Sequence, residues 1–322
     1  MPETDPQPAI DDPPWNRPSG SGRKNERAPG LSILFATFNG APTLPAVLDG
    51  YAAQAPGDWR LVIVDNASTD ETPEIVGQFA RTLPITRFRC PEPGKNRALN
   101  FALDRLGDHG RLCVFTDDDA VPHPGFIAAW REAAARSDCD RRIFGGAVAP
   151  RFPRESPGHV QSFASRFAEL YAENNGASEF RASDIYGPNM AVPGVLFERG
   201  ARFDEAIGPN SSDASYPMGS ETEFCTRVAR EFGLEATFVA RAKVDHLVRA
   251  RQTSLSFIRA RAFRHGRGHA LRLRLERGRM AQWRQLARLA LLNRDPDLSE
   301  AEKLWNGEWR RGFVSETLGL GS

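Results

Sequence analysis

Three adjacent aspartates, Asp117, Asp118 and Asp119, are the side chains of this sequence best suited to chemistry, and they directly follow the apolar residues 112–115. Aspartate is a poor strand residue, and three neighbouring negative charges repel one another, so a positive partner is expected. Carboxylate oxygens are good ligands for Mg2+ or Mn2+, which also bind phosphate oxygens. The cluster indicates a metal–diphosphate site at the carboxyl end of a strand. A solvated acidic turn is the alternative.

The elements that must position this cluster alternate between strands and helices. Continuous apolar runs predict strands, and helix-spaced apolar residues or capping residues predict helices. The predicted strands are 31–36, 59–64, 85–89 and 112–115, and the predicted helices are 44–53, 71–81 and 96–106. This order predicts an α/β fold with a mostly parallel sheet flanked by helices. Polar groups follow each strand and should meet at one edge of the sheet, where a nucleotide would bind; they include Thr37, Asn39, Asp65 and Asn66.

The second half of the chain is less regular. The apolar spacing predicts helices over 160–173, 195–200 and 221–232, a short strand within 185–193, a strand over 237–248, and helix from 255 onward. We expect three regions: a disordered tail (1–29), a catalytic domain (30–250) and an arginine-rich helical C-terminal extension (251–322). Acceptor recognition is expected within 151–213.

Composition excludes several classes of protein. The 322 residues carry a formal net charge of +1, so bulk charge predicts no partner. Four scattered cysteines without a CxxC pair argue against a disulfide framework or a thiolate zinc site. The sequence has no apolar run of about 18 residues and no signal-peptide core near its start, so we expect a cytoplasmic protein.

Nucleotide binding by the common glycine-rich loops is also disfavoured. A dinucleotide fingerprint would place G-x-G-x-x-G after the first strand, but residues 36–41 contain one glycine. The sequence 91–96 has a Gly-Lys pair without the Ser or Thr of a P-loop. Metal and carboxylates are therefore the expected means of holding a phosphate.

A set of short motifs occurs in a suggestive order. They are FATFN (35–39), VDNASTD (64–70), GKNRALN (94–100), TDDD (116–119), GPNMAV (187–192), FDE (203–205), GSETEF (219–224) and VDH (244–246). Together, over about residues 31–268, they resemble the family 2 glycosyltransferases, whose catalytic domain has the GT-A fold. The resemblance implies an inverting transfer of one sugar from a nucleotide diphosphate donor, with UDP the common nucleotide, to a glycan or lipid-linked acceptor.

The resemblance also implies roles for individual residues, read position by position. The nucleotide would be held by groups that follow the first strands and the GKNRALN motif: Ala36 and Thr37 against the base, Asp65 or Asn66 in a hydrogen bond to it, and Asn39, Lys95 and Arg97 on the loops around it. Asp117 should contact the ribose and Asp119 an Mn2+ or Mg2+ ion, so that the aspartates form the DxD motif of the family. Asp118 would support them.

The late motifs supply a further ligand and a base. His246 matches a second metal or diphosphate ligand of the family, although a buried core histidine is an equal alternative. Inversion needs a general base on the face of the sugar opposite the leaving group. Glu221 occupies the position of that base, where the family often has aspartate, and Glu223 competes with it. Residues two apart on a helix do not share a face, so one of them should point at the sugar.

The C-terminal segment is unusually rich in arginine. Ten arginines lie between Arg259 and Arg288, interspersed with leucines, Met280 and Trp283. A helix packed on the catalytic domain with a charged outer face is the simplest interpretation. A more specific interpretation is a peripheral contact with the inner face of an anionic membrane. Nucleic-acid binding is disfavoured. Arg264 or Arg267 could close over the donor diphosphate.

Two other functions remain open at this level. A nucleotidyltransferase could use a similar sheet and metal, but residues 36–41 lack the basic signature that a triphosphate would need. A non-catalytic nucleotide-sugar-binding protein could keep the same fold, but the intact aspartate cluster and Glu221 argue against it.

Overall fold

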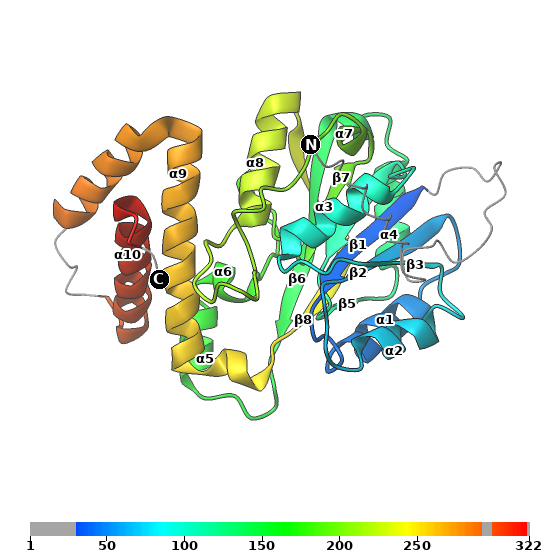
Figure 1. Ribbon diagram of the computed structural model, residues 1–322, viewed down its shortest axis with the longest axis horizontal. Helices are drawn as coiled ribbons and strands as arrows, with labels where there is room; N and C mark the ends of the chain where they lie inside the picture. The colour runs from blue at the N-terminus through cyan, green and yellow to red at the C-terminus, as the bar shows by residue number, and fades with distance from the viewer. Residues whose placement is uncertain (1–29, 292–297, 321–322) are drawn as a thin grey trace, which may run out of the picture.

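A mixed eight-stranded sheet forms the centre of the computed structural model, which describes residues 30–291 and 298–320 (Figure 1). The strand order is β3-β2-β1-β4-β7-β6-β8-β5. The strands are β1 (Leu31–Thr37), β2 (Trp59–Asp65), β3 (Ile85–Arg89), β4 (Leu112–Thr116), β5 (Ala120–Pro122), β6 (Arg142–Arg151), β7 (Asn189–Pro193) and β8 (Glu235–Leu247). The first four strands pair in parallel, and β8 is parallel to β6. Strand β7 runs antiparallel between β4 and β6, and β5 runs antiparallel to β8.

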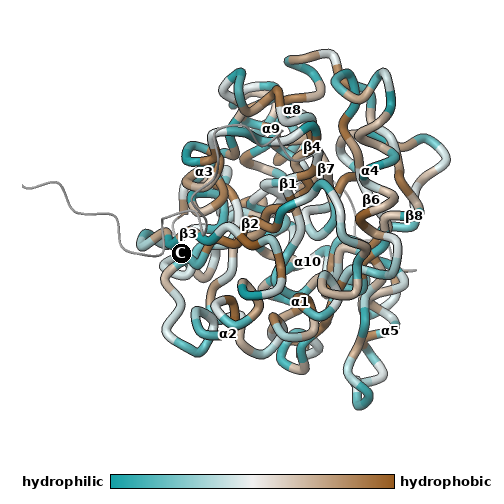
Figure 2. The backbone as a smooth tube through the Cα atoms, turned by 90° about the vertical axis from the view of Figure 1, so that its right-hand side faces the viewer, coloured by the Kyte–Doolittle hydropathy of each residue, from teal (hydrophilic) through white to brown (hydrophobic). Residues whose placement is uncertain are grey.

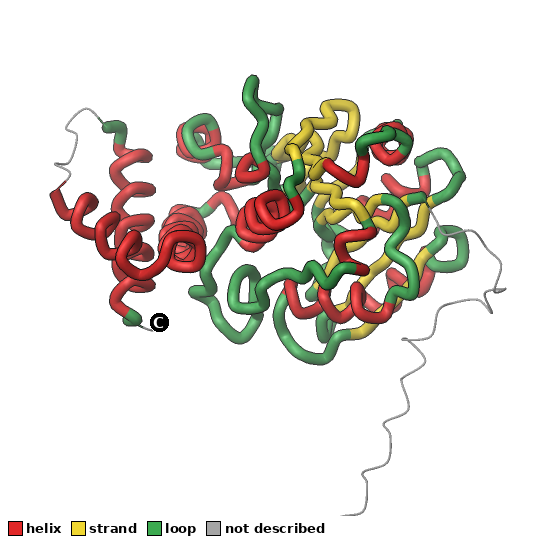
Figure 3. The backbone as a smooth tube through the Cα atoms, turned by 90° about the horizontal axis from the view of Figure 1, so that it is seen from above, coloured by secondary structure: helices red, strands yellow, loops and turns green. Residues whose placement is uncertain are grey.

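Helices flank this sheet (Figure 3), and the described part of the chain has three short 3-10 turns in its loops. The helices are α1 (Leu44–Ala52), α2 (Thr72–Phe79), α3 (Lys95–Arg105), α4 (Phe126–Ala134), α5 (His159–Ala164), α6 (Ala168–Tyr171), α7 (Val195–Glu198), α8 (Ser220–Phe232), α9 (Leu255–Leu291) and α10 (Glu300–Leu318). The turns are η2 (Cys139–Arg141), η3 (Ala182–Asp184) and η4 (Ala250–Thr253). The predicted mostly parallel α/β sheet with a helical extension is confirmed.

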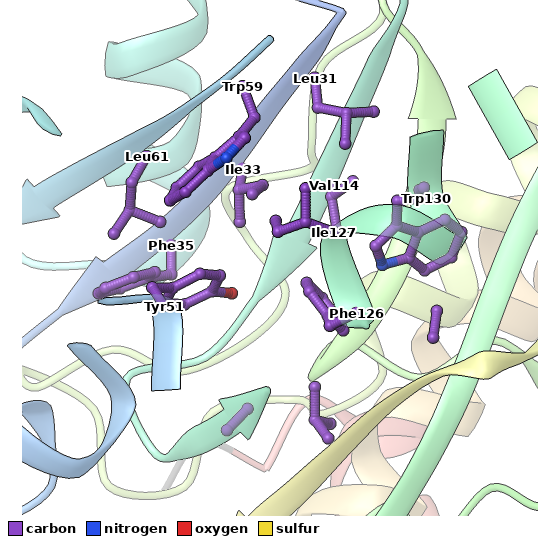
Figure 4. Close-up of a cluster of buried hydrophobic side chains, with 14 of the residues drawn as sticks. Leu31, Ile33, Phe35, Tyr51, Trp59, Leu61, Val114, Phe126, Ile127 and Trp130 are labelled. Carbon is purple, nitrogen blue, oxygen red and sulfur yellow. The ribbon is translucent and has the colours of Figure 1, made fainter. Parts of the chain in front are cut away.

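The two faces of the sheet carry separate apolar cores, because successive strand residues point to opposite faces. Leu31, Ile33 and Phe35 of β1 join one core with helices α1 and α4, whereas Leu34 joins the other with α3, α7 and α8. The central strands β1 and β2 are largely hydrophobic along their length (Figure 2). Figure 4 shows the first core, where Phe126 and Trp130 of α4 meet edge to face with ring centroids 6.3 Å apart. Burial on both faces explains the continuous apolar runs of these strands.

The sequence prediction failed between strands β4 and β7. The helix predicted over 160–173 is wrong as a single element, because the backbone at Phe167 (φ −130°, ψ 79°) separates α5 from α6. No element was predicted over 120–151, where the structure places β5, α4, η2 and β6. The predicted tail 1–29 lies outside the described residues, and the boundary near residue 250 stays a prediction.

The C-terminal helices α9 and α10 pack side by side at one end of the molecule (Figures 1 and 3). Two glycines allow this close crossing: a Cβ at Gly266 would overlap the carbonyl of Trp309, and one at Gly312 would overlap the carbonyl of Phe263. A third apolar core, with Trp305 and Phe163, joins the pair to α5 and α6. Within the described residues, no helix combines the length and apolar composition that crossing a membrane requires.

Candidate active site

Two adjoining cavities meet at the carboxyl ends of strands β1 and β4. The first, of about 490 Å3, is lined by the end of β1, by Asn66, by Asp117–Asp119 and by residues of η4. The second, of about 480 Å3, is lined by Glu221, His246 and residues of α9. Lys95, Asp117 and Asp119 line both, so the aspartate cluster stands at the junction. This is the sheet edge at which the sequence predicted a nucleotide site.

The loops that follow β1 and β2 are held together by hydrogen bonds at one side of the first cavity. Asn39, in the left-handed conformation (φ 53°), accepts from the backbone N–H of Thr69 at 2.9 Å, and its own N–H donates to Ser68 Oγ at 3.0 Å. The Gly40 N–H donates to Thr72 Oγ1 at 2.8 Å. Asn39 does not line either cavity. Its side chain positions the loop between Thr37 and α1.

Asp65 and Asn66 end strand β2 in different situations. The Asn66 amide is fully engaged: Nδ2 donates to the carbonyls of Cys90 and Glu92, and Oδ1 accepts from the Gly94 N–H at 2.9 Å. Asp65 Oδ1 accepts from the Ser68 N–H at 2.9 Å, and the buried Oδ2, which has no hydrogen-bond partner among the described residues, forms an ion pair with Arg89 Nε at 3.9 Å. Asn66 lines the first cavity, whereas Asp65 lines neither cavity.

Lys95, at the start of α3, lies between two carboxylates. Its Nζ is 2.6 Å from Asp117 Oδ1 and 3.0 Å from Glu221 Oε1. Burial disfavours charge on all three groups, but the ion pairs outweigh it for Lys95, whose pKa is raised, and for Glu221, whose pKa is lowered. For Asp117, burial and repulsion from Asp119 and Glu221 outweigh the attraction of Lys95, so its pKa is raised.

Asp118 points toward the β1 loop. Its Oδ2 accepts a hydrogen bond from Thr37 Oγ1 at 2.6 Å. Burial, followed by repulsion from Asp119, raises the pKa of Asp118 to about 7 despite that hydrogen bond. Asp118 thus joins the ends of β1 and β4.

Asp119 and His246 form a pair across the junction from Lys95. His246 Nδ1 lies 2.7 Å from the Tyr171 carbonyl, so that nitrogen is the donor and Nε2 is left to face Asp119 Oδ1 at 3.5 Å. Burial opposes charge on both groups, but their mutual attraction lowers the pKa of Asp119 and raises that of His246. His246 is therefore buried with a polar partner at each ring nitrogen.

This pair fits a divalent cation as two of its ligands. Adjacent ligands of an ion that binds at about 2.1 Å are separated by roughly 3 Å, close to the 3.5 Å between Asp119 and His246. The Tyr171 carbonyl fixes the imidazole orientation in the way that outer-shell partners of metal ligands do. Among the described residues, no group of three His, Cys, Asp or Glu side chains could hold a metal by itself. Substrate oxygens would have to complete the coordination.

The two candidate bases point in different directions from the first turn of α8. Glu221 lines the second cavity, in a space that exists because residue 187 is glycine; a Cβ there would overlap the Glu221 carboxylate. Glu223 is 7% exposed, lines neither cavity and pairs with Arg227 at 2.6 Å. The structure brings Glu221, and not Glu223, to the aspartate cluster.

Two residues expected at the donor lie elsewhere. Arg97 pairs with Glu205 at 2.9 Å and with Glu92 at 2.8 Å on the exposed side of α3. Arg264 stands 4.9 Å from the ring centroid of Tyr216 and lines a separate cavity beside Arg259. The structure therefore brings together Ala36, Thr37, Asn66, Lys95, Asp117, Asp118, Asp119, Glu221 and His246.

Some residues at the first cavity were missed from the sequence. Arg249, Arg251 and Gln252 follow strand β8 and close one side of it. Arg249 Nη2 donates to Thr43 Oγ1 at 3.1 Å, which ties η4 to the start of α1. Their position could have indicated this, because they follow the Val-Asp-His motif directly after a strand, and the other polar residues of the site also follow strands.

Similar solved structures define the class of fold. A mannosyltransferase from Pyrobaculum calidifontis in complex with GDP-Man and Mn2+ superposes with a TM-score of 0.60 over 91% of this chain and 88% of that one, at 20% identity. S. aureus TarS 1–349 in complex with UDP-GlcNAc gives a TM-score of 0.52 over 89% and 81%, at 16% identity. At such identities the likeness concerns the fold, which is of the GT-A type.

The sequence comparisons give the family. Residues 32–182 match the model described as "Glycosyl transferase family 2", and this region belongs to that family. A "PGL/p-HBAD biosynthesis glycosyltransferase" from Mycobacterium tuberculosis is 52% identical over 93 residues. That match covers 28% of this chain and 36% of the relative, so it spans about a third of the curated protein's length. The predicted family is confirmed for residues 32–182.

Proposed function

We propose that this chain is an inverting glycosyltransferase that moves one sugar from a nucleotide diphosphate-sugar to an acceptor hydroxyl. The carrying observation is the junction of the two cavities: Asp117 and Asp119 line both, whereas Glu221 lines only the second. A donor in the first cavity has its diphosphate at the junction, and an acceptor in the second reaches the sugar from the other side. Inversion needs this separation because base and leaving group act on opposite faces.

Glu221 is the general base in this proposal. It takes the proton of the acceptor hydroxyl while that oxygen bonds to the anomeric carbon and the bond to the diphosphate breaks. The Lys95 ammonium, 3.0 Å away, now holds the Glu221 carboxylate in its charged, weakly basic form. A donor diphosphate at the junction competes for that ammonium and so restores the basicity of Glu221.

Asp119 and His246 would hold a Mn2+ or Mg2+ ion. When bound, the cation supplies electrostatic stabilisation for the negative charge on the leaving diphosphate. Support comes from the donor pair at 3.5 Å and from the Mn2+ in the Pyrobaculum structure of the same fold.

The nucleotide base would rest against Ala36 and Thr37, which line the first cavity. Asp65 or Asn66 would hydrogen-bond to it: Asn66 lines the first cavity but its amide is used by the backbone, and Asp65 ends the same strand with Oδ2 in an ion pair with Arg89 at 3.9 Å. UDP remains our first expectation for the nucleotide. The structural neighbours contain GDP-Man in one case and UDP-GlcNAc in the other, so both donors belong in the test.

A glycan or lipid-linked acceptor is proposed, with peripheral contact to the inner face of a membrane. Leu275, before the kink of α9 at Gly278 (φ 80°, ψ 170°), and Met280 and Trp283, after it, are 53%, 67% and 42% exposed among arginines of the same segment. Apolar side chains framed by cations suit an anionic lipid surface. Co-sedimentation with phosphatidylglycerol vesicles, but not with phosphatidylcholine vesicles, is the expected result. Equal binding to both, or to neither, would contradict the contact.

The donor assignment is tested by thermal shift of the full chain with UDP-, GDP- and dTDP-sugars, with and without Mn2+. We expect one nucleotide to raise the melting temperature only with the metal, and Asp119→Ala to lose the effect. Asp49, at an exposed position of α1, gives the control variant Asp49→Ala. A shift that persists in Asp119→Ala would remove Asp119 from the metal site.

The base is tested by comparing Glu221→Gln with Glu223→Gln. The first should slow sugar transfer by at least about 100-fold and leave donor binding in place, because proton transfer contributes roughly 10²–10⁴ to the rate. The second should lower stability through the loss of its pair with Arg227 and spare the chemical step. Robust turnover by Glu221→Gln would refute the assignment.

A further inference from the structure

The second cavity has a basic and aromatic wall that the proposed chemistry does not use. Arg261, His265, His269 and Arg272 lie four, four and three residues apart on α9, so they share one face of that helix, and all four line the cavity. Trp309 of α10 lines it as well. The C-terminal helix pair therefore forms the wall opposite the sheet.

The two arginines of this wall lack acidic partners. Among residues 30–291 and 298–320, no carboxylate lies within 4.0 Å of either guanidinium, and the buried Nε of Arg261 has no hydrogen-bond partner. Arg267 and Arg274 of the same helix behave differently, since both reach Glu316, at 2.9 Å and 3.8 Å. Of these four arginines, the two that line the cavity have no carboxylate within 4.0 Å, and the two that reach Glu316 do not line it.

The electrostatic environment of the wall is positive. Burial, followed by repulsion from the surrounding arginines, lowers the pKa of His265 to about 3, and burial with Arg272 lowers that of His269 to about 4. Both imidazoles are therefore neutral near pH 7 and offer hydrogen bonds rather than charge. Five carboxylates also line the cavity, but none is within 4.0 Å of the Arg261 or Arg272 guanidinium; they are Asp117, Asp119, Glu169, Asp184 and Glu221.

The wall reaches the proposed base. The Arg272 guanidinium lies against Gly219, where a Cβ would overlap Nη1. Gly219 is the residue before α8 and stands two positions before Glu221. An anion held by Arg272 would consequently lie near the acceptor hydroxyl that Glu221 deprotonates.

We propose that Arg261 and Arg272 bind an anionic oxygen group, a phosphate or a carboxylate, that the acceptor carries. The inference rests on the proposed function, because it takes the second cavity as the acceptor site. Partly buried cations without partners are costly, and a guanidinium matches the paired oxygens of either group. His265 and His269 add neutral hydrogen bonds, and Trp309 gives an apolar surface for the rest of the acceptor.

The test is a thermal titration of the full chain with sodium phosphate, at constant ionic strength set with sodium chloride. The nucleoside diphosphate that stabilises the chain and Mg2+ are present at saturation, so that the first cavity is filled. Phosphate should raise the melting temperature of the wild type with an apparent Kd that becomes about tenfold weaker in Arg261→Gln and in Arg272→Gln. Arg259→Gln is the matched control, because it removes the same charge from an exposed position of α9.

The proposal is overturned if phosphate does not stabilise the wild type, or if Arg261→Gln and Arg272→Gln respond as Arg259→Gln does. If a glutamine variant does not fold, Arg261→Lys or Arg272→Lys keeps the charge and should weaken binding less. Two further probes identify the kind of anion: acetate represents a carboxylate, and dihexanoyl phosphatidic acid, below its micelle concentration, represents a lipid phosphate. If the wild type binds any of the three anions more tightly than both variants do, the result supports the site. Stabilisation by the nucleotide in the same samples tests the proposed function separately.

Discussion

Replacing Lys95 with methionine would test how the site holds its negative charge. The ammonium lies 2.6 Å from Asp117 and 3.0 Å from Glu221, and the three side chains are 17–22% exposed. At an effective dielectric constant of about 20, charges 3 Å apart interact by roughly 5 kcal/mol, from which the desolvation of the lysine must be subtracted. Solvent screening reduces the net further, and we expect Lys95→Met to lower the free energy of unfolding by about 2–3 kcal/mol at pH 7.

The same substitution should have a defined pH dependence. Lys95 lowers the pKa of Glu221 in the folded protein. The ion pair therefore stabilises the fold above the ordinary carboxyl pKa, and this stabilisation is lost as pH falls through the lowered pKa of Glu221. Without Lys95, the carboxylates take up protons at higher pH, so the deficit of the variant should shrink between pH 7 and pH 5. Urea unfolding at both pH values measures this. Lys303→Met, which breaks an exposed pair with Glu300, should cost less than about 1 kcal/mol. An equal loss in the two variants, or a deficit independent of pH, would refute the reasoning.

Three further predictions concern packing, protonation and loop structure. Gly312→Ala should destabilise the helix pair by about 2 kcal/mol or more, because its Cβ would overlap the Phe263 carbonyl, whereas Gly307→Ala on open helix surface should stabilise by roughly 0.5–1 kcal/mol; urea unfolding compares them. The neutral form of buried His265 stabilises the fold above its ordinary pKa of 6.5, so stability should fall by about 2 kcal/mol between pH 7 and pH 5, and His265→Gln should flatten that slope. Asn66→Ala removes three hydrogen bonds to backbone groups and should cost about 2–4 kcal/mol, with faster amide exchange at Gly94; unchanged exchange there would contradict the tying role.

The motifs at the ends of β1, β2 and β4 could be found from sequence because these strands are mostly apolar. They are buried on both faces, so their sequences show apolar runs, interrupted by Ser32 and Arg60, that end at the polar site residues. The region 120–151 gave no such signal. Strand β5 has three residues, and β6 ends in a half-exposed stretch with a register shift after Gly146. Single-sequence patterns detect long, periodic elements better than short or irregular ones.

For individual site residues, the sequence likewise predicted the position in the fold better than the contacts of the side chain. Asn39 and Asn66 sit at the predicted edge of the sheet, yet their side chains are used to join loops. Arg97 and Arg264 belong to suitable motifs, but ion pairs with Glu205 and Glu92 hold the first, and Tyr216 lies beside the second. A residue's type and its place after a strand do not say which way its side chain turns, because that depends on partners such as Glu205, which is 108 positions from Arg97.

By itself, the sequence determined the alternating strands and helices, the family, and the gathering of carboxylates at one sheet edge, because apolar periodicity and strand ends are local properties of the chain. Tertiary structure decided that Glu221 rather than Glu223 faces the aspartates, that Lys95 bridges Asp117 to Glu221, and that α9 turns two unpaired arginines into the second cavity. These outcomes depend on which distant side chains meet when the sheet, α8 and the C-terminal helices pack together, and that packing is set by the whole buried core.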